Sequence, residues 1–429
     1  MSGMRIAGIE SGPMDFDAIV VGGGPAGSTA AHLMAHAGKR VLVLEKDVFP
    51  RFHIGESLLP FAMSIFERLG VAETLASTSQ RKLGAFFSEE GTPDSRKVVF
   101  ADGLEPGHGL AFQVKRAEFD QMLLEAARQA GADVRIGWRV EALMKDHDAV
   151  IGVSACDPEG KRVDLSARVV VDATGRDALG SRAGGGIVPE AALRRGALYA
   201  HFRNVPRAPE ETEGDIRMVV FGTGWWWFIP FSDGTWSVGV VSSETPPGSS
   251  LEERFDAMIA GTETVKSRLA ASERICPVRS ASDYSYSVRT IVADGYVAVG
   301  DAAGFLDPIF SSGVFLALAT GENAADEIIR ALEKPGYVSA RAMRRYERFA
   351  RRGFARFRKF VIGFYDPAFR NIFYQRPPLR ALYTSVTSIL AGGVFRPSAP
   401  LRFWSGIFLY FTGRESRKRQ RELAAGAPS

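Results

Sequence analysis

One stretch near the start of the chain decides the fold: residues 17–45 read DAIVVGGGPAGSTAAHLMAHAGKRVLVLE. Residues 17–21 are mostly apolar and β-branched, which predicts a short buried strand. The alanine-rich run from Ser28 to Gly38 predicts a helix that ends at a glycine. Residues 39–45 predict a second buried strand. The whole stretch therefore predicts a strand-helix-strand unit that opens a parallel sheet.

The glycine-rich turn in this unit has the spacing Gly22-x-Gly24-x-x-Gly27, with Ala26 before the last glycine. Gly22 permits the tight turn, Gly24 lets a pyrophosphate approach the backbone, and Gly27 lets helix and strand pack closely. The phosphates would lie at the positive N-terminal end of the helix. Glu45 ends the second strand, where a carboxylate can accept a hydrogen bond from a ribose. Together these features predict a dinucleotide site, with a plain glycine turn as the alternative.

The composition is that of a large globular protein with little cysteine. The chain has 429 residues, of which 46% are hydrophobic and 24% charged, and its net charge is +4. Roughly two to four domains, or one large lobed unit, fit this length. Cys156 and Cys276 are too few for a disulfide scaffold or a thiolate-rich metal site. His32 and His36 lack the glutamate of a metalloprotease motif, so we expect no metal.

The sequence contains no segment that predicts export or membrane insertion. Residues 1–14 contain no apolar signal core. The apolar stretches 381–395 and 403–411 are separated by Arg396 and Arg402. Both stretches fall short of the roughly 18 residues that span a bilayer. We therefore expect a soluble, cytoplasmic protein in a reducing compartment.

Further along the chain, the hydrophobic pattern predicts a second sheet and a helical end. Residues 134–140 and 163–173 each predict one strand, and residues 198–241 alternate in runs that predict an antiparallel sheet. Residues 295–301 predict another buried strand, and a long helix is expected after Gly313. The predicted fold class is α/β. It comprises a Rossmann-type nucleotide-binding domain over 15–195 and 285–335, an inserted, mainly antiparallel substrate sheet over 196–284, and a helical C-terminal region over 336–429.

Motifs far apart in the chain resemble those of one flavoprotein family. The glycine turn, Asp172-Ala-Thr-Gly175 and Gly300-Asp301 resemble the three FAD contacts of the glutathione-reductase-like, hydroxybenzoate-hydroxylase-type flavoproteins. Two further strings resemble the signatures of the flavin-dependent halogenases: Trp225-x-Trp227-x-Ile229-Pro230 and Phe305-x-x-Pro308-x-x-Ser311-x-Gly313. Residues 51–60, RFHIGESLLP, look like the segment beside the flavin in halogenases of phenols and pyrroles. The resemblance extends over residues 17–332.

This resemblance implies a halogenase that acts on an electron-rich aromatic ring of phenol or pyrrole type. Reduced FAD, delivered by a separate flavin reductase, would use O2 and chloride or bromide to produce hypohalous acid. Ser312 and Gly313 would offer backbone N–H groups to the halide, with an ordinary helix start as the alternative. Arg116 would border the FAD, with a helix-cap arginine on the surface as the alternative. The remaining FAD-binding residues implied by the motifs are Glu45, Arg51, Asp301, Pro308 and Gly313.

Lys82 stands where halogenases carry their catalytic lysine, within the string QRKLGAF at residues 80–86. By this resemblance, the lysine would hydrogen-bond hypohalous acid or become a haloamine, and would direct the halogen onto the ring. An apolar tunnel would lower the pKa of its amine, which suits either role. The alternative is a solvated surface lysine, with Arg81 as the buried residue.

Four aromatic residues bear on the substrate and on the activity that the resemblance implies. Trp225 and Trp227 share one face of a strand; their pattern favours an aromatic core face, and the resemblance implies a barrier between substrate and flavin. Phe310 stands where tryptophan halogenases carry a glutamate, which argues against free tryptophan as the substrate. Phe315 stands where the phenol and pyrrole branch often carries a histidine. That departure keeps a degenerate FAD-binding protein open as an alternative, beside a halogenase-like monooxygenase or an isoprenoid-lipid reductase.

The segment 341–360 is strongly basic, with nine Lys or Arg residues against one acid, Glu347. A solvated helix face with an apolar packing stripe is the default interpretation. The sharper hypothesis is that this face docks an acidic acyl or peptidyl carrier protein that presents a tethered substrate. An anionic membrane surface ranks behind it. Nucleic acid is not expected, because no other segment offers a base or phosphate track.

Overall fold

The first sheet contains the strands on either side of the glycine-rich turn. The computed structural model describes residues 14–183, 186–282, 285–375 and 379–424. In this part of the chain the sheet has the order β20-β21-β11-β1-β2-β7. All its strands run parallel except the short edge strand β20 (Val292–Ala293). The parallel strands are β1 (Ala18–Val21), β2 (Val41–Glu45), β7 (Asp133–Ile136), β11 (Val170–Asp172) and β21 (Tyr296–Ala298).

Helices cover this sheet and bury its central strands. α1 (Pro25–His36) packs against both α4 (Arg116–Gln129) and α8 (Ser312–Ala331). Every residue of β1 and β2 is buried, as expected for parallel strands that are covered on both faces. The strand-helix-strand unit predicted for residues 17–45 is therefore confirmed. Its helix begins at Pro25, because the fixed φ of proline suits the first helical position.

The second sheet is mainly antiparallel, as predicted, and has eight strands. Its centre consists of β13 (Gly196–Arg203), β16 (Trp236–Ser242), β15 (Gly224–Pro230) and β14 (Ile216–Phe221), paired in that order. β17 (Glu273–Arg274) and β18 (Arg279–Ser282) pair with β13. β4 (Gly84–Glu89) pairs in parallel with β14, and β5 (Ser95–Val99) follows it. The sheet thus includes residues 84–99 in addition to the predicted segment 196–284.

The two faces of this second sheet belong to different cores. α6 (Leu251–Ala260) and α7 (Glu263–Leu269) pack against the outer face, where Trp226 and Phe228 contact a cluster that includes Phe255. Trp225 and Trp227 point the other way, into the main core that joins both sheets. The period of two along β15 therefore places both tryptophans on one face, as predicted, and the structure shows that this is the inner face.

Two strand predictions were wrong in their extent. Residues 134–140 do not form one strand, because β7 ends at Ile136 and Gly137 turns the chain with φ +80°. β8 (Arg139–Asp146) then pairs with β9 (Ala149–Cys156). Residues 163–173 also divide: β10 (Arg162–Ser166) pairs with β9, whereas β11 joins the parallel sheet. In both segments the alternation of apolar and polar residues continues across the break, so the pattern did not indicate the change of sheet.

Short elements connect these layers. Near the first sheet lie α2 (Met63–Arg68), α3 (Ala72–Thr78) and α5 (Leu179–Ala183). β3 (Gln80–Lys82) pairs with β6 (Ala111–Gln113), and β19 (Tyr286–Val288) pairs with β12 (Ile187–Pro189) and β22 (Gly304–Phe305). Six short 3-10 turns occur in the described residues: Pro60–Ala62, Phe100–Asp102, Gly175–Asp177, Ala191–Leu193, Gly300–Ala303 and Pro308–Phe310.

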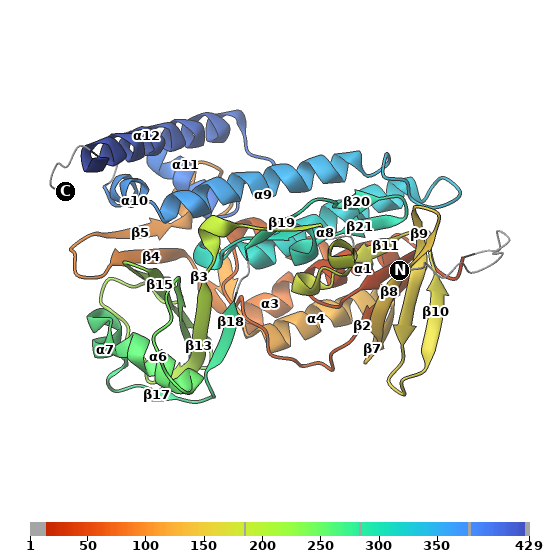
Figure 1. Ribbon diagram of the computed structural model, residues 1–429, viewed down its shortest axis with the longest axis horizontal. Coiled ribbons are helices and arrows are strands. Elements are labelled where there is room, and N and C mark those ends of the chain that lie inside the picture. Colours follow the sequence, from red (N-terminus) through yellow and green to blue (C-terminus); the bar gives the residue numbers. More distant parts are fainter. Residues whose placement is uncertain (1–13, 184–185, 283–284, 376–378, 425–429) are drawn as a thin grey trace.

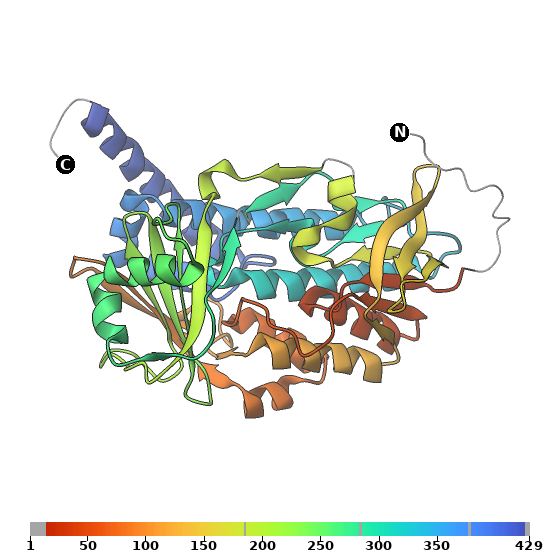
Figure 2. The same cartoon turned by 60° about the horizontal axis from the view of Figure 1, so that its bottom comes forward.

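In the described residues after α8, the C-terminal region contains four helices: α9 (Arg344–Phe364), α10 (Pro367–Tyr374), α11 (Arg380–Leu390) and α12 (Ala399–Ala424). α9 packs on α8, and α12 packs on α10 and α11 (Figure 1). The end of α12 extends away from the rest of the molecule (Figure 2). Within the described ranges, no helix combines the length and apolar character needed to cross a bilayer.

Candidate active site

A cavity of about 640 Å³ lies between the two sheets. One side is formed by the turns that follow β1, β2, β11 and β21, at the carboxyl ends of the parallel strands. The opposite side is formed by the inner face of the second sheet. The cavity gathers eleven of the predicted site residues: Gly22, Gly24, Ala26, Glu45, Arg51, Arg116, Trp225, Trp227, Asp301, Pro308 and Gly313. Gly27, Lys82 and Ser312 do not line it.

The three glycines of the turn are required for different reasons. A Cβ atom on Gly22 would lie 2.4 Å from the carbonyl oxygen of Ala173, and one on Gly27 would lie 2.0 Å from that of Gly22. The protein itself therefore excludes side chains at Gly22 and Gly27. At Gly24 the nearest protein atom would be 3.6 Å from a Cβ, so the chain leaves this position free beside the cavity. Room at Gly24 at the start of α1 fits a pyrophosphate.

Acidic residues surround this turn. Glu45 accepts hydrogen bonds from the backbone N–H groups of Gly23 and Asp47, both at 2.7 Å. These bonds hold its carboxylate beside the glycine turn. Asp301 lines the cavity, and burial raises the pKa of its carboxyl to about 6. A half-buried carboxyl that lines the cavity at this edge suits a hydroxyl-rich ligand such as a ribityl chain.

Asp172, the first residue of the Asp-Ala-Thr-Gly string, supports the site from behind. Its carboxylate accepts from Thr174 Oγ1 at 2.6 Å, from Gly180 N at 2.9 Å and from the Tyr296 hydroxyl at 2.8 Å. The side chain is completely buried and closes the turn after β11. Ala173, Thr174 and Gly175 line the cavity in its place.

Arg116 is a buried residue, and the alternative of a surface helix-cap arginine is wrong. Its guanidinium forms a bidentate ion pair with Asp120, at 2.7 and 2.9 Å, and donates to the carbonyl of Ile54 at 2.6 Å. Arg51 approaches the same Asp120 at 3.5 Å. The shared carboxylate places two guanidinium groups at the cavity, where they can meet an anionic or carbonyl-rich ligand.

The loop before α8 contains the predicted anion pocket. Ser311 precedes the helix in a left-handed conformation with φ +56° and forms no side-chain cap. The first N–H groups of α8 have no partners within the helix. The Ser312 hydroxyl is buried without a hydrogen-bond partner in the described part of the chain, and Gly313 lines the cavity, where a Cβ atom would lie 3.8 Å from the ring of Phe305. An unpaired hydroxyl beside a helix N-terminus fits a small anion.

The inner face of β15 forms the opposite wall of the cavity. Trp225 and Trp227 are buried, and their rings lie 5.7 Å apart. Each indole is fixed by a hydrogen bond: Trp225 Nε1 donates to the Tyr365 hydroxyl at 2.8 Å, and Trp227 Nε1 donates to Ser237 Oγ at 3.1 Å. The tryptophans are thus held rigidly against the cavity.

Tyr365 was not anticipated from the sequence. It follows α9, is partly buried, and lies beside the carboxyl of Asp307, which precedes Pro308. Burial raises the pKa of Asp307 to about 6, and the Tyr365 hydroxyl opposes that rise. The guanidinium of Arg195 lies 3.8 Å from the Tyr365 ring. These residues connect the end of α9 to the tryptophan wall and to the anion loop, and no single segment of sequence contains them.

Lys82 is completely enclosed, with 1% of its side chain exposed, whereas the neighbouring Arg81 is exposed. The alternative of a solvated Lys82 is therefore wrong. Its Nζ donates to Ser57 Oγ at 2.8 Å and to the carbonyl of Leu58 at 2.9 Å. Burial lowers the pKa of Lys82 to about 7, against the opposing effect of the Asp215 carboxylate. Near neutral pH this amine exists in both protonation states.

Glu56 was noted in the sequence without a role, and the structure pairs it with His201. Glu56 lines the cavity, is 1% exposed, and lies 2.8 Å from Nε2 of His201. The other oxygen of Glu56 is buried without a hydrogen-bond partner in the described residues. His201 stands on β13, far away in sequence, so only the pairing of the two segments in space reveals the contact.

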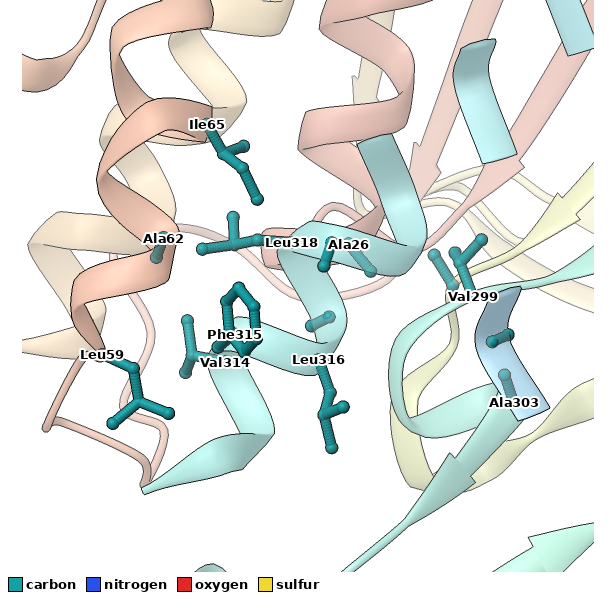
Figure 3. Packing of buried hydrophobic residues seen from close by; sticks show 14 of the residues in the cluster. Ala26, Leu59, Ala62, Ile65, Val299, Ala303, Val314, Phe315, Leu316 and Leu318 are labelled. Carbon is teal, nitrogen blue, oxygen red and sulfur yellow. The ribbon is translucent and has the colours of Figure 1, made fainter. Parts of the chain in front are cut away.

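The two phenylalanines that depart from the family pattern both pack in apolar surroundings. Phe310 lies in a cluster of rings with Phe87 and Phe364. Phe315 lies among Leu59, Ala62 and Leu318 in the packing between α8 and the Pro60–Ala62 turn (Figure 3). Neither residue therefore places a polar group at the site.

The chain is similar to several known proteins in sequence and in structure. The family described as tryptophan halogenase matches residues 17–105 and 101–372. The 1H-pyrrole-2-carbonyl-[peptidyl-carrier protein] chlorinase of Pseudomonas fluorescens is 32% identical, over 89% of this chain and 90% of that protein. The corresponding brominase of Pseudoalteromonas luteoviolacea is 33% identical, over 74% of this chain and 78% of that protein. The solved structure of the flavin-dependent brominase Bmp2 is 28% identical, with a TM-score of 0.81, and covers 94% of this chain and 99% of its own.

Proposed function

Because this chain belongs to the tryptophan halogenase family of flavin-dependent enzymes, we propose that it halogenates an electron-rich aromatic ring presented on a carrier protein. The chain is a flavin-dependent halogenase, an oxidoreductase that uses FAD and a halide. The family, fold class, enzyme class and cofactor predicted from the motifs are thus confirmed. One observation carries the proposal for its chemistry: a buried lysine with a lowered pKa lies one hydroxyl group away from the cavity.

The residues around the cavity fit FAD. Gly22 and Gly24 would hold the pyrophosphate at the start of α1, and Glu45 would accept from a ribose hydroxyl. Asp301 would accept from the ribityl chain. Reduced FAD, when bound, supplies the activation of O2 and yields hypohalous acid with a halide. A separate flavin reductase would deliver it.

The start of α8 would hold the chloride or bromide. The first backbone N–H groups of the helix and the Ser312 hydroxyl, which has no hydrogen-bond partner in the described residues, would offer hydrogen bonds to an anion beside Gly313. Pro308 fixes the loop that leads to these residues. Helix dipole and hydroxyl together favour a small, singly charged ion over a neutral ligand.

Lys82 would receive hypohalous acid that leaves the cavity and would direct the halogen to the ring. As an ammonium group it can donate a hydrogen bond to hypohalous acid; as an amine it can accept the halogen. A pKa of about 7 keeps both forms accessible at neutral pH. Trp225 and Trp227 would form the barrier that keeps the ring away from the flavin.

A carrier-bound pyrrole or phenol is the substrate class that the chain supports best. Phe310 replaces the glutamate of tryptophan halogenases by an apolar ring. Two similar relatives are named for a pyrrole-2-carbonyl group on a peptidyl carrier protein. The exposed basic face of α9 would dock such an acidic carrier, and the reaction would take place in the cytoplasm. Arg345, Arg348 and Arg352 are exposed on this face.

The test of the halogenase chemistry needs no substrate. The FAD-bound protein is reduced, mixed with O2 with and without bromide, and hypohalite is trapped in the presence of catalase. We expect trapped hypohalite that depends on the halide. If peroxide alone forms, whatever the halide, a monooxygenase or a degenerate FAD-binding protein is the better interpretation.

A further inference from the structure

Ser57 lies in the wall that separates the cavity from Lys82. Its side chain is 4% exposed and lines the cavity, and its Oγ accepts the hydrogen bond from Lys82 Nζ at 2.8 Å. Leu58, the other acceptor of this amine, does not line the cavity. Of the two hydrogen-bond acceptors of Lys82 in the described residues, Ser57 is therefore the one that also lines the cavity.

The backbone holds Ser57 and Lys82 in a fixed relation. Ser57 bridges to Gln113, and the carbonyl of Phe112 accepts from Leu58 N at 2.9 Å. On its other edge β6 pairs with β3, which aligns Ala111 with Lys82. The serine and the lysine thus flank one short strand. Such a scaffold leaves the amine little freedom to turn away from the hydroxyl.

The two acceptors of the lysine differ in what they can do. A carbonyl oxygen only accepts, whereas a hydroxyl group accepts from an ammonium and donates to a neutral amine. Because Lys82 titrates near neutrality, a partner that serves both forms keeps Nζ in place when the proton leaves. The ring of Phe100 lies 5.1 Å from Nζ on a further side and offers no such exchange.

We propose that Ser57 is a positioning residue for Lys82, which holds the lysine amine at the cavity wall in both of its protonation states. This inference rests on the proposed role of Lys82. Because Ser57 lines the cavity and also accepts from the amine, it is the residue through which hypohalous acid in the cavity would reach Lys82. The wall then selects a small polar molecule and excludes the ring.

The first experiment measures Lys82 itself. The FAD-bound protein is labelled with 13C at Cε of lysine, and the Lys82→Met variant identifies the Lys82 resonance in NMR spectra. We expect Ser57→Ala to move the Lys82 titration to lower pH, because the ammonium form loses a charge-assisted hydrogen bond. The Asp215 carboxylate opposes the lowering of the Lys82 pKa, and it is left intact. Ser57→Thr, which keeps the hydroxyl, should restore the titration.

The matched control is Ser154→Ala. Ser154 is also a buried serine that accepts from a cationic side chain, Arg162, at 2.7 Å, but it lies on β9 away from the cavity. This variant should leave the Lys82 titration unchanged. The proposal is overturned if the Lys82 pKa in Ser57→Ala equals that of the wild type. It is also overturned if Ser57→Thr shifts the Lys82 pKa as much as Ser57→Ala does.

The second experiment measures the passage of halogen. The probe is pyrrole-2-carboxylate loaded on a peptidyl carrier protein, and the readout is halogenated ring per hypohalite formed. Ser57→Ala should lower this ratio about tenfold, the effect of one lost hydrogen bond to a charged group. If Lys82→Met keeps the ratio of the wild type, the proposed function of the lysine fails. The NMR titration still decides whether Ser57 holds the amine, so the two failures are distinguishable.

Discussion

The two sides of the cavity are built by different means. On the side of the parallel sheet, backbone geometry defines the site: glycines that tolerate no Cβ, a helix start, and turns after four strands. Elsewhere on its wall, side chains from distant segments define it: Trp225 is held by Tyr365, and Ser57 accepts a hydrogen bond from Lys82, which lies behind the wall. A backbone-defined site is intolerant of any added atom. A site built from side-chain contacts should lose function gradually, one interaction at a time.

The largest effect is expected on the backbone-defined side, at Gly22. A Gly22→Val substitution forces a Cβ to within 2.4 Å of the Ala173 carbonyl at a positive φ, so FAD binding and folding should be lost together. At Gly24 the chain itself makes no such contact, and Gly24→Ala should fold with an unchanged Tm but bind FAD at least about tenfold more weakly. Thermal unfolding reports on folding and the absorbance of bound flavin reports on FAD binding, so the two measurements together distinguish the two variants. Equal losses at both glycines would contradict this division.

Charge reversal on α9 should produce the next effect. Arg348→Glu with Arg352→Glu should weaken turnover of a carrier-bound substrate about tenfold and leave turnover of the free ring unchanged, because docking alone loses its attraction. Arg351 is less suitable, because it pairs with Glu347 and with the carbonyl of Arg289. The control is Arg128→Glu, an exposed arginine on α4. If the double variant turns over the carrier-bound substrate at the wild-type rate at low salt, α9 does not dock the carrier protein.

The buried amine should make stability depend on pH. Burial lowers the pKa of Lys82 from its ordinary value of 10.5 to about 7. Between these values the unfolded chain binds a proton that the folded chain does not, so stability rises with pH across this window. The wild-type protein should gain stability relative to Lys82→Met from about pH 7 to pH 10, as measured by urea unfolding. A constant difference between the two proteins over this range would show that the folded lysine titrates normally.

The smallest effect is expected at the tryptophan wall. Tyr365→Phe removes the acceptor of the Trp225 indole N–H but keeps the ring on Arg195. Because one neutral hydrogen bond contributes about 1 kcal/mol, we expect a loss of roughly fivefold in halogenated product per FAD oxidised. Tyr346→Phe is the control on α9, since the Tyr346 hydroxyl donates to Ala298 in the first sheet. If the control lowers the ratio equally, Tyr365 has no special relation to the wall.

The same difference explains how far the sequence predicted the structure. Gly22, Gly27 and Glu45 lie within one short stretch, so their spacing alone predicted the turn, the helix and the adjacent carboxylate. The alternation along β15 likewise predicted that Trp225 and Trp227 share a face. These features depend on local backbone geometry, which the order of residues describes directly.

What could not be predicted depends on segments that meet only in the folded chain. Nothing near Tyr365 in the sequence indicates Trp225, and nothing near Glu56 indicates His201. The entry of β4 into the second sheet was missed because a parallel partner can come from any part of the chain. The predicted domain boundaries remain predictions, as do the catalytic, halide-binding and barrier roles of the site residues.

In the proposed mechanism, the part of the cavity wall that contains Ser57 separates the production of hypohalous acid from its use by Lys82. The most direct measurement compares Lys82→Met with the wild type, with hypohalite and halogenated ring quantified in the same reaction. We predict that hypohalite forms at the rate of the wild type while ring halogenation falls at least about 100-fold, the usual effect of losing a catalytic proton-transfer group. Halogenation of the ring by Lys82→Met at the ratio of the wild type would contradict the claim.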